Sequence, residues 1–202
     1  MNENACIQFF DEQFRRQVAA AEYVLNPFES AALPHLRARV LDYGCGLGNL
    51  AVEAARRGCS VLALDASHAA IKHLRAVAEQ DRLALRAEEA DLRTYELTED
   101  FDVVVCIGLL MFFDCPTAYH QLSQLQDRVR PGGSAVVNVL TEGTTYMDMF
   151  APEGHCLFNR SALRAHFARW EIVSFTQQEF PAPNGTRKVF ETIIARKPCC
   201  PS

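Results

Sequence analysis

Apolar residues are spaced along this chain in two alternating patterns. Short segments that are apolar throughout, or that alternate apolar with polar residues, predict five strands, at 40–43, 60–65, 83–89, 101–107 and 134–140. Between them lie stretches with apolar residues at helical spacing, as in Leu122, Leu125 and Val129. Because strand and helix alternate, we expect an α/β fold with a mostly parallel sheet and helices on both of its faces.

The N-terminal segment predicts two helices. Residues 5–25 carry apolar side chains at helical spacing, and Asn26-Pro27-Phe28-Glu29 has the residue types of a helix N-terminus. The longer helix either packs against the sheet or folds over a ligand site. In the second case Phe14 or Tyr23 would line a pocket.

The C-terminal segment predicts a short helix and then a hairpin. Asn159 is expected to begin a helix that ends near Arg169. Segments 170–176 and 188–196 have strand composition and flank a turn with proline and glycine at 181–185. Together with the five strands before them, they predict seven strands and an antiparallel C-terminal hairpin.

The first predicted strand runs through three glycines directly into a helix, in the sequence Val40-Leu41-Asp42-Tyr43-Gly44-Cys45-Gly46-Leu47-Gly48-Asn49. Glycines allow positive φ angles and close approach of a ligand, and the helix behind them offers free N–H groups. A dinucleotide-binding loop would need a glycine where this chain has Asn49. A carboxylate at Asp42 would repel a pyrophosphate. The loop therefore favours a ligand that carries a positive charge.

Asp65 ends the second predicted strand, about 20 residues after Gly44, which is the spacing of the acid that binds ribose hydroxyls in nucleotide-binding βαβ units. The alternative is that Asp65 caps the helix that follows, which begins near Ser67. We expect ribose binding, because the spacing agrees with the glycine loop.

Composition narrows the possible functions. The chain has 202 residues, 49% hydrophobic and 22% charged, and a net charge of −5. These values fit one soluble domain, and the negative charge disfavours nucleic-acid binding. No apolar run reaches the length of a membrane span, and the N-terminus lacks signal-peptide character. We expect a cytoplasmic protein.

The chain has eight cysteines, none of them at Cys-x-x-Cys spacing. We interpret them as small apolar residues in a reducing compartment, and we expect no metal site. The terminal Cys199-Cys200-Pro201-Ser202 has Pro201 where a prenylation motif needs an aliphatic residue, so a frayed tail is expected.

The glycine loop with its preceding aspartate resembles motif I of the class I S-adenosylmethionine (SAM) methyltransferases. The resemblance implies a Rossmann-like seven-stranded sheet and SAM as cofactor. It implies one domain over residues 1–202, with an N-terminal helical cap (1–37), a SAM-binding core (38–197) and a tail (198–202). The cofactor-binding residues that it implies are Asp42, Gly44, Cys45, Gly46, Gly48, Asp65, Ala66, Asp91, Leu92, Ile107 and Gly108. Asp42 would lie near the methionine end, Asp65 at the ribose and Asp91 at the adenine.

Later segments resemble the small tellurite-resistance methyltransferases, among them Leu110-Met111-Phe112-Phe113 and Pro131-Gly132-Gly133. Either Met111 or Phe112 is expected to wall the site. That family carries a histidine before the second hairpin strand, where this chain has Phe180-Pro181-Ala182-Pro183, but the basic residue after Asn-Gly is retained as Arg187.

Two catalytic candidates follow. His155 lies in the loop 142–158 and can exchange a proton near neutral pH, and Arg187 would attract an anionic acceptor. We expect methyl transfer from SAM to a small molecule, such as a chalcogen oxyanion or a thiol-like nucleophile. The alternative is a non-catalytic SAM-binding interaction module. The expected partners include no nucleic acid and no membrane, and the protein would be a monomer or homodimer.

Overall fold

The structure is a computed structural model that describes residues 4–20, 23–150 and 154–199, with side chains from residue 11 onward. Its strands are β1 (Arg39–Tyr43), β2 (Ser60–Asp65), β3 (Leu85–Glu89), β4 (Phe101–Ile107), β5 (Val129–Leu140), β6 (Glu171–Pro181) and β7 (Arg187–Arg196). The α-helices are α1 (Asn4–Ala19), α2 (Pro27–Ala32), α3 (Asn49–Arg56), α4 (His68–Gln80), α5 (Cys115–Asp127) and α6 (Ala162–His166). Three single 3₁₀ turns are η1 (Leu33–His35), η2 (Leu110–Phe112) and η3 (Pro183–Gly185).

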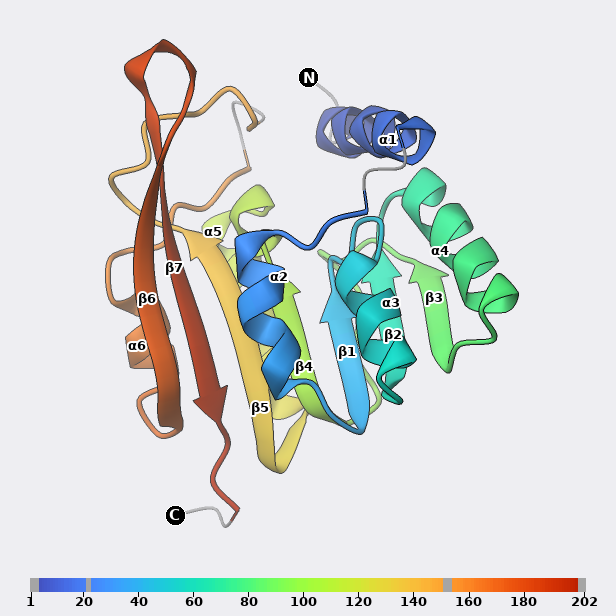
Figure 1. The fold of residues 1–202 in the computed structure, drawn as a ribbon. Coiled ribbons are helices and arrows are strands. Elements are labelled where there is room, and N and C mark those ends of the chain that lie inside the picture. Colours follow the sequence, from blue (N-terminus) through green and yellow to red (C-terminus); the bar gives the residue numbers. More distant parts are fainter. Residues whose placement is uncertain (1–3, 21–22, 151–153, 200–202) are drawn as a thin grey trace.

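The seven strands form one sheet in the order β3-β2-β1-β4-β5-β7-β6 (Figure 1). Strands β1 to β5 pair in parallel, and β7 pairs antiparallel with both β5 and β6. The predicted fold class is therefore confirmed, including the C-terminal hairpin. Helix α1 lies above the carboxyl ends of the parallel strands (Figure 1).

Side-chain alternation along the central strands divides the core between the two faces. In β2, Val61 and Ala63 pack with the apolar residues of α3 and α4, whereas Leu62 and Leu64 pack with those of α5 and α6. Both faces of the strand are buried, which explains its continuous apolar sequence. The polar residues of β2, Ser60 and Asp65, are consequently confined to its two ends.

Two helix predictions need correction. Helix α1 ends at Ala19, earlier than the expected residue 25, and α6 spans only Ala162–His166. Ser161 has a left-handed backbone, with φ of 72°, so α6 cannot begin at Asn159. The side chains of Ile7 and Phe10 and the tail residues 200–202 lie outside the described residues.

The interpretation of all cysteines as free thiols is wrong for one pair. Cys115, the first residue of α5, and Cys156 form a disulfide across a sequence separation of 41 residues. Their spacing carries no signal, because the fold alone brings them together. Cys45, Cys59 and Cys106 are free and buried, as expected of small apolar residues.

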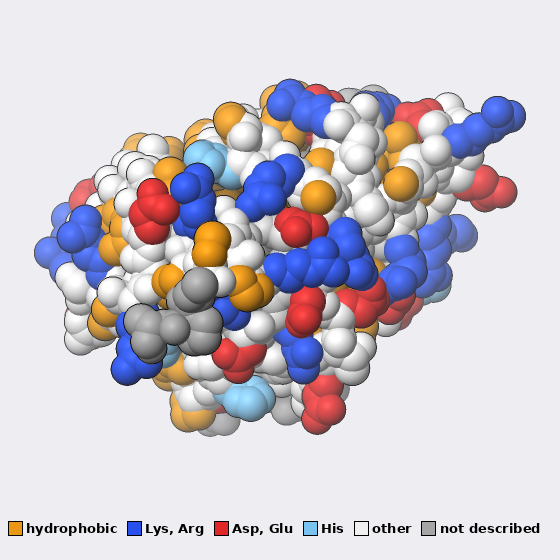
Figure 2. Space-filling model, turned by 90° about the horizontal axis from the view of Figure 1, so that it is seen from below, with side chains coloured by type: hydrophobic (Ala, Val, Ile, Leu, Met, Phe, Trp, Pro, Cys, Tyr) orange, Lys and Arg blue, Asp and Glu red, His pale blue; other side chains and the backbone are white. Residues whose placement is uncertain are grey.

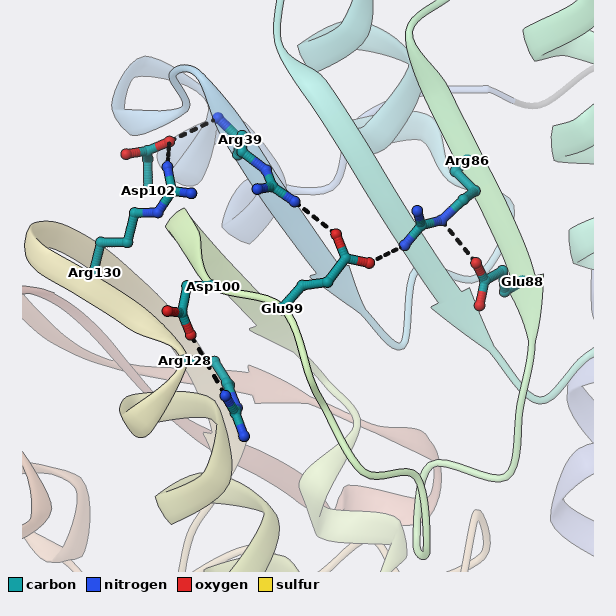
Figure 3. A network of polar contacts seen from close by, with 8 residues as sticks. All are labelled: Arg39, Arg86, Glu88, Glu99, Asp100, Asp102, Arg128 and Arg130. Atoms are coloured by element: carbon teal, nitrogen blue, oxygen red, sulfur yellow. Dashed lines mark hydrogen bonds and ion pairs between the residues drawn. The ribbon is translucent and has the colours of Figure 1, made fainter.

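Charged side chains gather on the side of the molecule opposite α1, near the amino ends of the parallel strands (Figure 1). Seen from below, basic and acidic groups alternate over the middle of this face (Figure 2). Glu99 bridges Arg39 and Arg86, and Asp102 accepts hydrogen bonds from the Arg130 guanidinium and the Arg39 backbone (Figure 3). These arginines are therefore neutralised within the chain, at a gain of about 0–1 kcal/mol for each exposed pair.

Among the described residues, no helix is both long and apolar enough to cross a bilayer. The same part of the chain holds no cluster of three or more His, Cys, Asp or Glu side chains arranged to bind a metal.

Candidate cofactor and active site

A cavity of about 650 Å³ opens at the carboxyl ends of β1, β2 and β4, beneath α1. Its volume is within the usual range for small-molecule sites, roughly 300–1,000 Å³. All eleven residues expected to bind the cofactor line it: Asp42, Gly44, Cys45, Gly46, Gly48, Asp65, Ala66, Asp91, Leu92, Ile107 and Gly108. The fold thus brings together residues that are more than sixty positions apart in the sequence.

The glycine loop is held in a conformation that other residues would strain. Gly44 has φ of 83° and Gly48 has φ of 73°. A Cβ at Gly48 would come 2.5 Å from the Leu74 side chain, and one at Gly44 would come 2.9 Å from Leu109. The N–H groups of Gly44 and Cys45 donate to the Leu64 carbonyl, which joins the loop to β2. These positions need glycine for packing as well as for ligand approach.

Asp65 is one of the polar residues that line the cavity. Its Oδ2 accepts from the Gly46 N–H at 2.8 Å, and its Oδ1 accepts from the Ser67 N–H at 2.9 Å. Burial raises the pKa of this carboxyl, and those hydrogen bonds oppose the rise. The capping role belongs to Ser67, whose hydroxyl accepts from the Ala70 N–H. Asp65 retains acceptor capacity for ligand hydroxyls, because each carboxylate oxygen accepts more than one hydrogen bond.

Asp91 and Leu92 form the side of the cavity beyond Asp65. Two hydrogen bonds from the Arg93 side chain, at 3.0 and 3.1 Å, hold the pKa of Asp91 below its ordinary value. The Leu92 carbonyl accepts from the buried Tyr43 hydroxyl at 2.7 Å. The hydrogen bond from Tyr43 therefore fixes this segment to β1, and both Asp91 and Leu92 line the cavity.

Asp42 is almost fully buried, with 5% of its surface exposed. Burial raises its pKa to about 8, with further contributions from the charges of Glu29 and Asp65. A carboxyl in this environment would be stabilised in its ionised form by a ligand cation.

Helix α1 closes the cavity from above, as one of the two alternatives anticipated. Gln13, Phe14 and Gln17 all line the cavity, and the Ser67 hydroxyl donates a hydrogen bond to Asp11. Tyr23 instead stacks on His73, with 5.1 Å between ring centroids.

The side nearest η2 is apolar. Leu109, Phe112 and Phe113 line the cavity there, whereas Met111 is only 3% exposed and belongs to the core. Phe112 packs against Phe150, with ring centroids 5.3 Å apart.

The two catalytic candidates lie outside the lining residues. His155 stacks on Phe150 at 5.0 Å and follows Gly154, which does line the cavity. Its Nδ1 atom is buried and has no hydrogen-bond partner among the described residues. Arg187 donates through Nε to the Gly143 carbonyl at 3.0 Å and lies 3.6 Å from Glu179 on the neighbouring hairpin strand.

Sequence reasoning missed part of the lining. Glu29 was identified only as a capping residue, a role that it does have, because it accepts from the Asn26 N–H at 2.7 Å. The position of Glu29 relative to Asp42 depends on how α2 packs beside β1. The local sequence does not predict that packing. The other lining residues without a prediction are Gln13, Gln17, Val24, Asn26, Leu47, Asn49, Leu50, Ser67, Arg93, Leu109, Phe113, Asp114 and Gly154.

The residues present fit SAM. The positive-φ glycine loop leaves room for close approach, Asp65 can accept from ribose hydroxyls, and Asp42 supplies a buried carboxyl that a ligand cation would hold in its ionised form. Such a set matches a nucleoside that carries a positively charged amino-acid arm.

Comparison with known proteins finds similarity to methyltransferases. Residues 40–133 match the methyltransferase domain family. A ubiquinone biosynthesis O-methyltransferase of Xanthomonas oryzae pv. oryzae is 28% identical over 164 residues, covering 73% of this chain and 68% of the relative. Hemagglutinin 1 of Eikenella corrodens is 28% identical over 139 residues, covering 69% of this chain. The match spans only 46% of that relative's length.

The solved structure of TehB from Haemophilus influenzae has the same fold, with a TM-score of 0.73 and 20% identity. The likeness covers 86% of this chain and 62% of TehB. Together with the strand order and the glycine loop, the match to the methyltransferase domain family shows that residues 40–133 form a methyltransferase domain, and it agrees with the resemblance to the SAM-dependent methyltransferases.

Proposed function

We propose that this protein transfers a methyl group from SAM to a small, soft nucleophile, either a thiol or a chalcogen oxyanion. One observation carries the proposal. A single cavity holds all eleven expected cofactor residues, and it continues into an apolar wall made by Leu109, Phe112 and Phe113.

SAM, when bound, supplies a methyl group on a positively charged sulfur that a nucleophile attacks directly. The protein's own task is to hold the two reactants in line and keep water out. Asp65 would bind the ribose, Asp91 and Leu92 the adenine, and Asp42 the methionine end. Because transfer to an anion cancels charge, the dry surface of Phe112 and Phe113 favours such an acceptor over a hydrated one.

His155 and Arg187 are proposed to serve the acceptor. His155 follows Gly154, which lines the cavity, and its imidazole would take a proton from a thiol that arrives protonated once the loop admits the acceptor. Arg187 would attract an anion towards the open side of the cavity, although its guanidinium is already bound to the Gly143 carbonyl.

The likeness to TehB agrees with the sequence resemblance to tellurite-resistance methyltransferases and supports a chalcogen oxyanion as the methyl acceptor. The name of the Xanthomonas relative, a ubiquinone biosynthesis O-methyltransferase, supports a small organic acceptor. The missing histidine before the second hairpin strand favours the thiol.

We further propose that the protein works in the cytoplasm as a monomer or homodimer and does not act on nucleic acid. The net charge of −5 and the internally paired arginines of the lower face support the last point.

An acceptor screen tests this function. The purified protein and SAM are offered tellurite, selenite, small thiols, small carboxylates, DNA and RNA in turn, and formation of S-adenosylhomocysteine is measured. We expect turnover with a thiol or an oxyanion and none with nucleic acid. Methylation of nucleic acid, or turnover with none of the soft acceptors, would contradict the proposal.

Three variants separate the roles within that screen. His155→Phe keeps the stacking on Phe150 and should lower kcat for a thiol more than for an oxyanion. Arg187→Ala should raise KM for an anionic acceptor without changing SAM affinity. Arg196→Ala, an exposed arginine of the same strand that pairs with Glu171, is the matched control and should change neither constant.

A further inference from the structure

The cavity is strongly acidic. Its described lining holds five carboxylates, Glu29, Asp42, Asp65, Asp91 and Asp114, against one cationic side chain, Arg93, which is bound to Asp91. The carboxylates of Asp65, Asp91 and Asp114 each accept at least two hydrogen bonds. Asp42 and Glu29 are the two carboxylates whose negative charge is least compensated by hydrogen bonds.

Asp42 faces negative or neutral groups on every element packed around it. Its position in β1 directs it to the face that carries α2 and α3, together with Val40. The groups that raise its pKa are Glu29 from α2, Asp65 from β2 and above all its own burial, while the backbone N–H of Ala51 in α3 opposes them.

Two thiols complete these surroundings. Cys45 of the glycine loop and Cys106 of β4 each have a pKa raised by burial and by the charge of Asp42, so both stay neutral. Among the residues that the structure describes, none of the groups that act on Asp42 therefore supplies the positive charge that its ionised form requires.

Glu29 approaches from the first turn of α2. One oxygen, Oε2, accepts from the Asn26 N–H, and the side chain lines the cavity. Burial raises its pKa as well. Two carboxyls that line one poorly compensated site do not both ionise at little cost, so a proton held by the pair would relieve their repulsion.

We propose that Glu29 and Asp42 form one cation site that holds a shared proton in the free protein and releases it to solvent when SAM binds. This inference rests on SAM being the cofactor, as proposed above. The sulfonium and ammonium charges of SAM replace the proton as the counter-charge of the pair. Glu29 is in this account a positioning residue for the charged end of the cofactor.

The pair also distinguishes the cofactor from its product. S-adenosylhomocysteine has lost the sulfonium charge, so it displaces the shared proton less completely and binds less tightly to an ionised pair. Because ionisation precedes tight binding, SAM affinity should rise with pH up to about 8, the pKa of free Asp42, and then level off. The affinity for S-adenosylhomocysteine should depend less on pH.

Calorimetry in buffers of different ionisation enthalpy counts the protons directly. Titration of the full chain with SAM at pH 7 should release a large fraction of one proton. SAM affinity should rise about fiftyfold between pH 6 and 8, the change that one released proton allows for a group with a pKa of about 8. S-adenosylhomocysteine should show less than half of both effects.

Glu29→Gln is the decisive variant, since its amide oxygen can still accept from the Asn26 N–H and preserve the cap. It should reduce proton release at least twofold and lower the preference for SAM over S-adenosylhomocysteine at pH 8 about three- to tenfold. Glu171→Gln, an exposed glutamate of β6, is the control and should match the wild type. Melting curves check that all three proteins fold.

The possible failures are distinguishable. If the wild type binds no SAM, the proposed function itself is wrong. If it binds SAM without releasing a proton, or if Glu29→Gln keeps the wild-type proton release and preference, the shared-proton site is wrong and the proposed function stands.

Discussion

Phe14 of α1 lies directly over Gly46 of the glycine loop, and a Cβ on Gly46 would come 3.1 Å from the Phe14 ring. The N-terminal helix therefore contacts the very backbone that the cofactor must approach. Together with the hydrogen bond from Ser67 to Asp11, this contact makes α1 the roof of the cavity.

Phe14→Ala should weaken SAM binding by about 1–2 kcal/mol, because the roof loses an aromatic ring that excludes water. Calorimetry measures the effect, and Arg15→Ala, exposed on the same helix, is the control. Equal SAM affinities for Phe14→Ala and the wild type would mean that α1 does not cover the bound cofactor.

Asp65→Ala should weaken SAM by roughly 1–3 kcal/mol, since it removes charge-assisted hydrogen bonds to the ribose. Ser67→Ala removes the cap of α4 and the hydrogen bond to Asp11, and should cost about 1 kcal/mol of stability with a smaller loss of affinity than Asp65→Ala. Binding and melting curves of both variants separate the roles. A large fall in melting temperature for Asp65→Ala at unchanged affinity would assign Asp65 to structure alone.

The sequence predicts the parallel core and the cofactor loop well, because both follow from local patterns. The strand 60–65 was placed residue for residue, since continuous apolar sequence and a following helix leave few alternatives. Asp42, Asp65 and Asp91 were expected to lie together because they stand at or just after the carboxyl ends of β1, β2 and β3, and all three line the cavity.

Contacts between distant segments were not predictable in this way. The pairing of Cys115 with Cys156 and the approach of Glu29 to Asp42 depend on how loops and helices settle on the sheet. The residues next to either pair in the sequence carry no pattern that predicts this packing. The apolar wall of the cavity is less evident in the sequence for the same reason. Leu109 and Phe113, which form part of it, have the residue types of an ordinary apolar core.

Asp42→Asn should stabilise the cofactor-free protein at alkaline pH. The folded-state pKa of Asp42 is about 8, above its unfolded value, so the neutral carboxyl favours folding and this contribution is lost as pH rises through 8. Between pH 6 and 9 the wild type should lose melting temperature relative to the variant, by about 2–4 °C for each kcal/mol. Parallel melting curves for the two proteins over this range would contradict a buried, uncompensated carboxyl.

Reduction of Cys115–Cys156 should destabilise the protein, because the bond closes a loop of about forty residues. The loss expected from loop entropy is about 3–4 kcal/mol. Dithiothreitol should lower the melting temperature of the wild type but not that of a Cys115→Ser, Cys156→Ser double variant. An intact-mass measurement without reductant that shows two free thiols at these positions would contradict the pairing.

The most direct test of the whole account is calorimetry of the purified protein with SAM, followed by competition with NAD. The glycine loop with Asp42 before it and Asn49 after it predicts one SAM per chain and no displacement by NAD, because a pyrophosphate offers no positive charge to the buried Asp42 carboxyl and Asn49 replaces the third glycine of a dinucleotide-binding turn. Displacement of SAM by NAD, or absence of SAM binding by the folded protein, would contradict the assignment of this cavity.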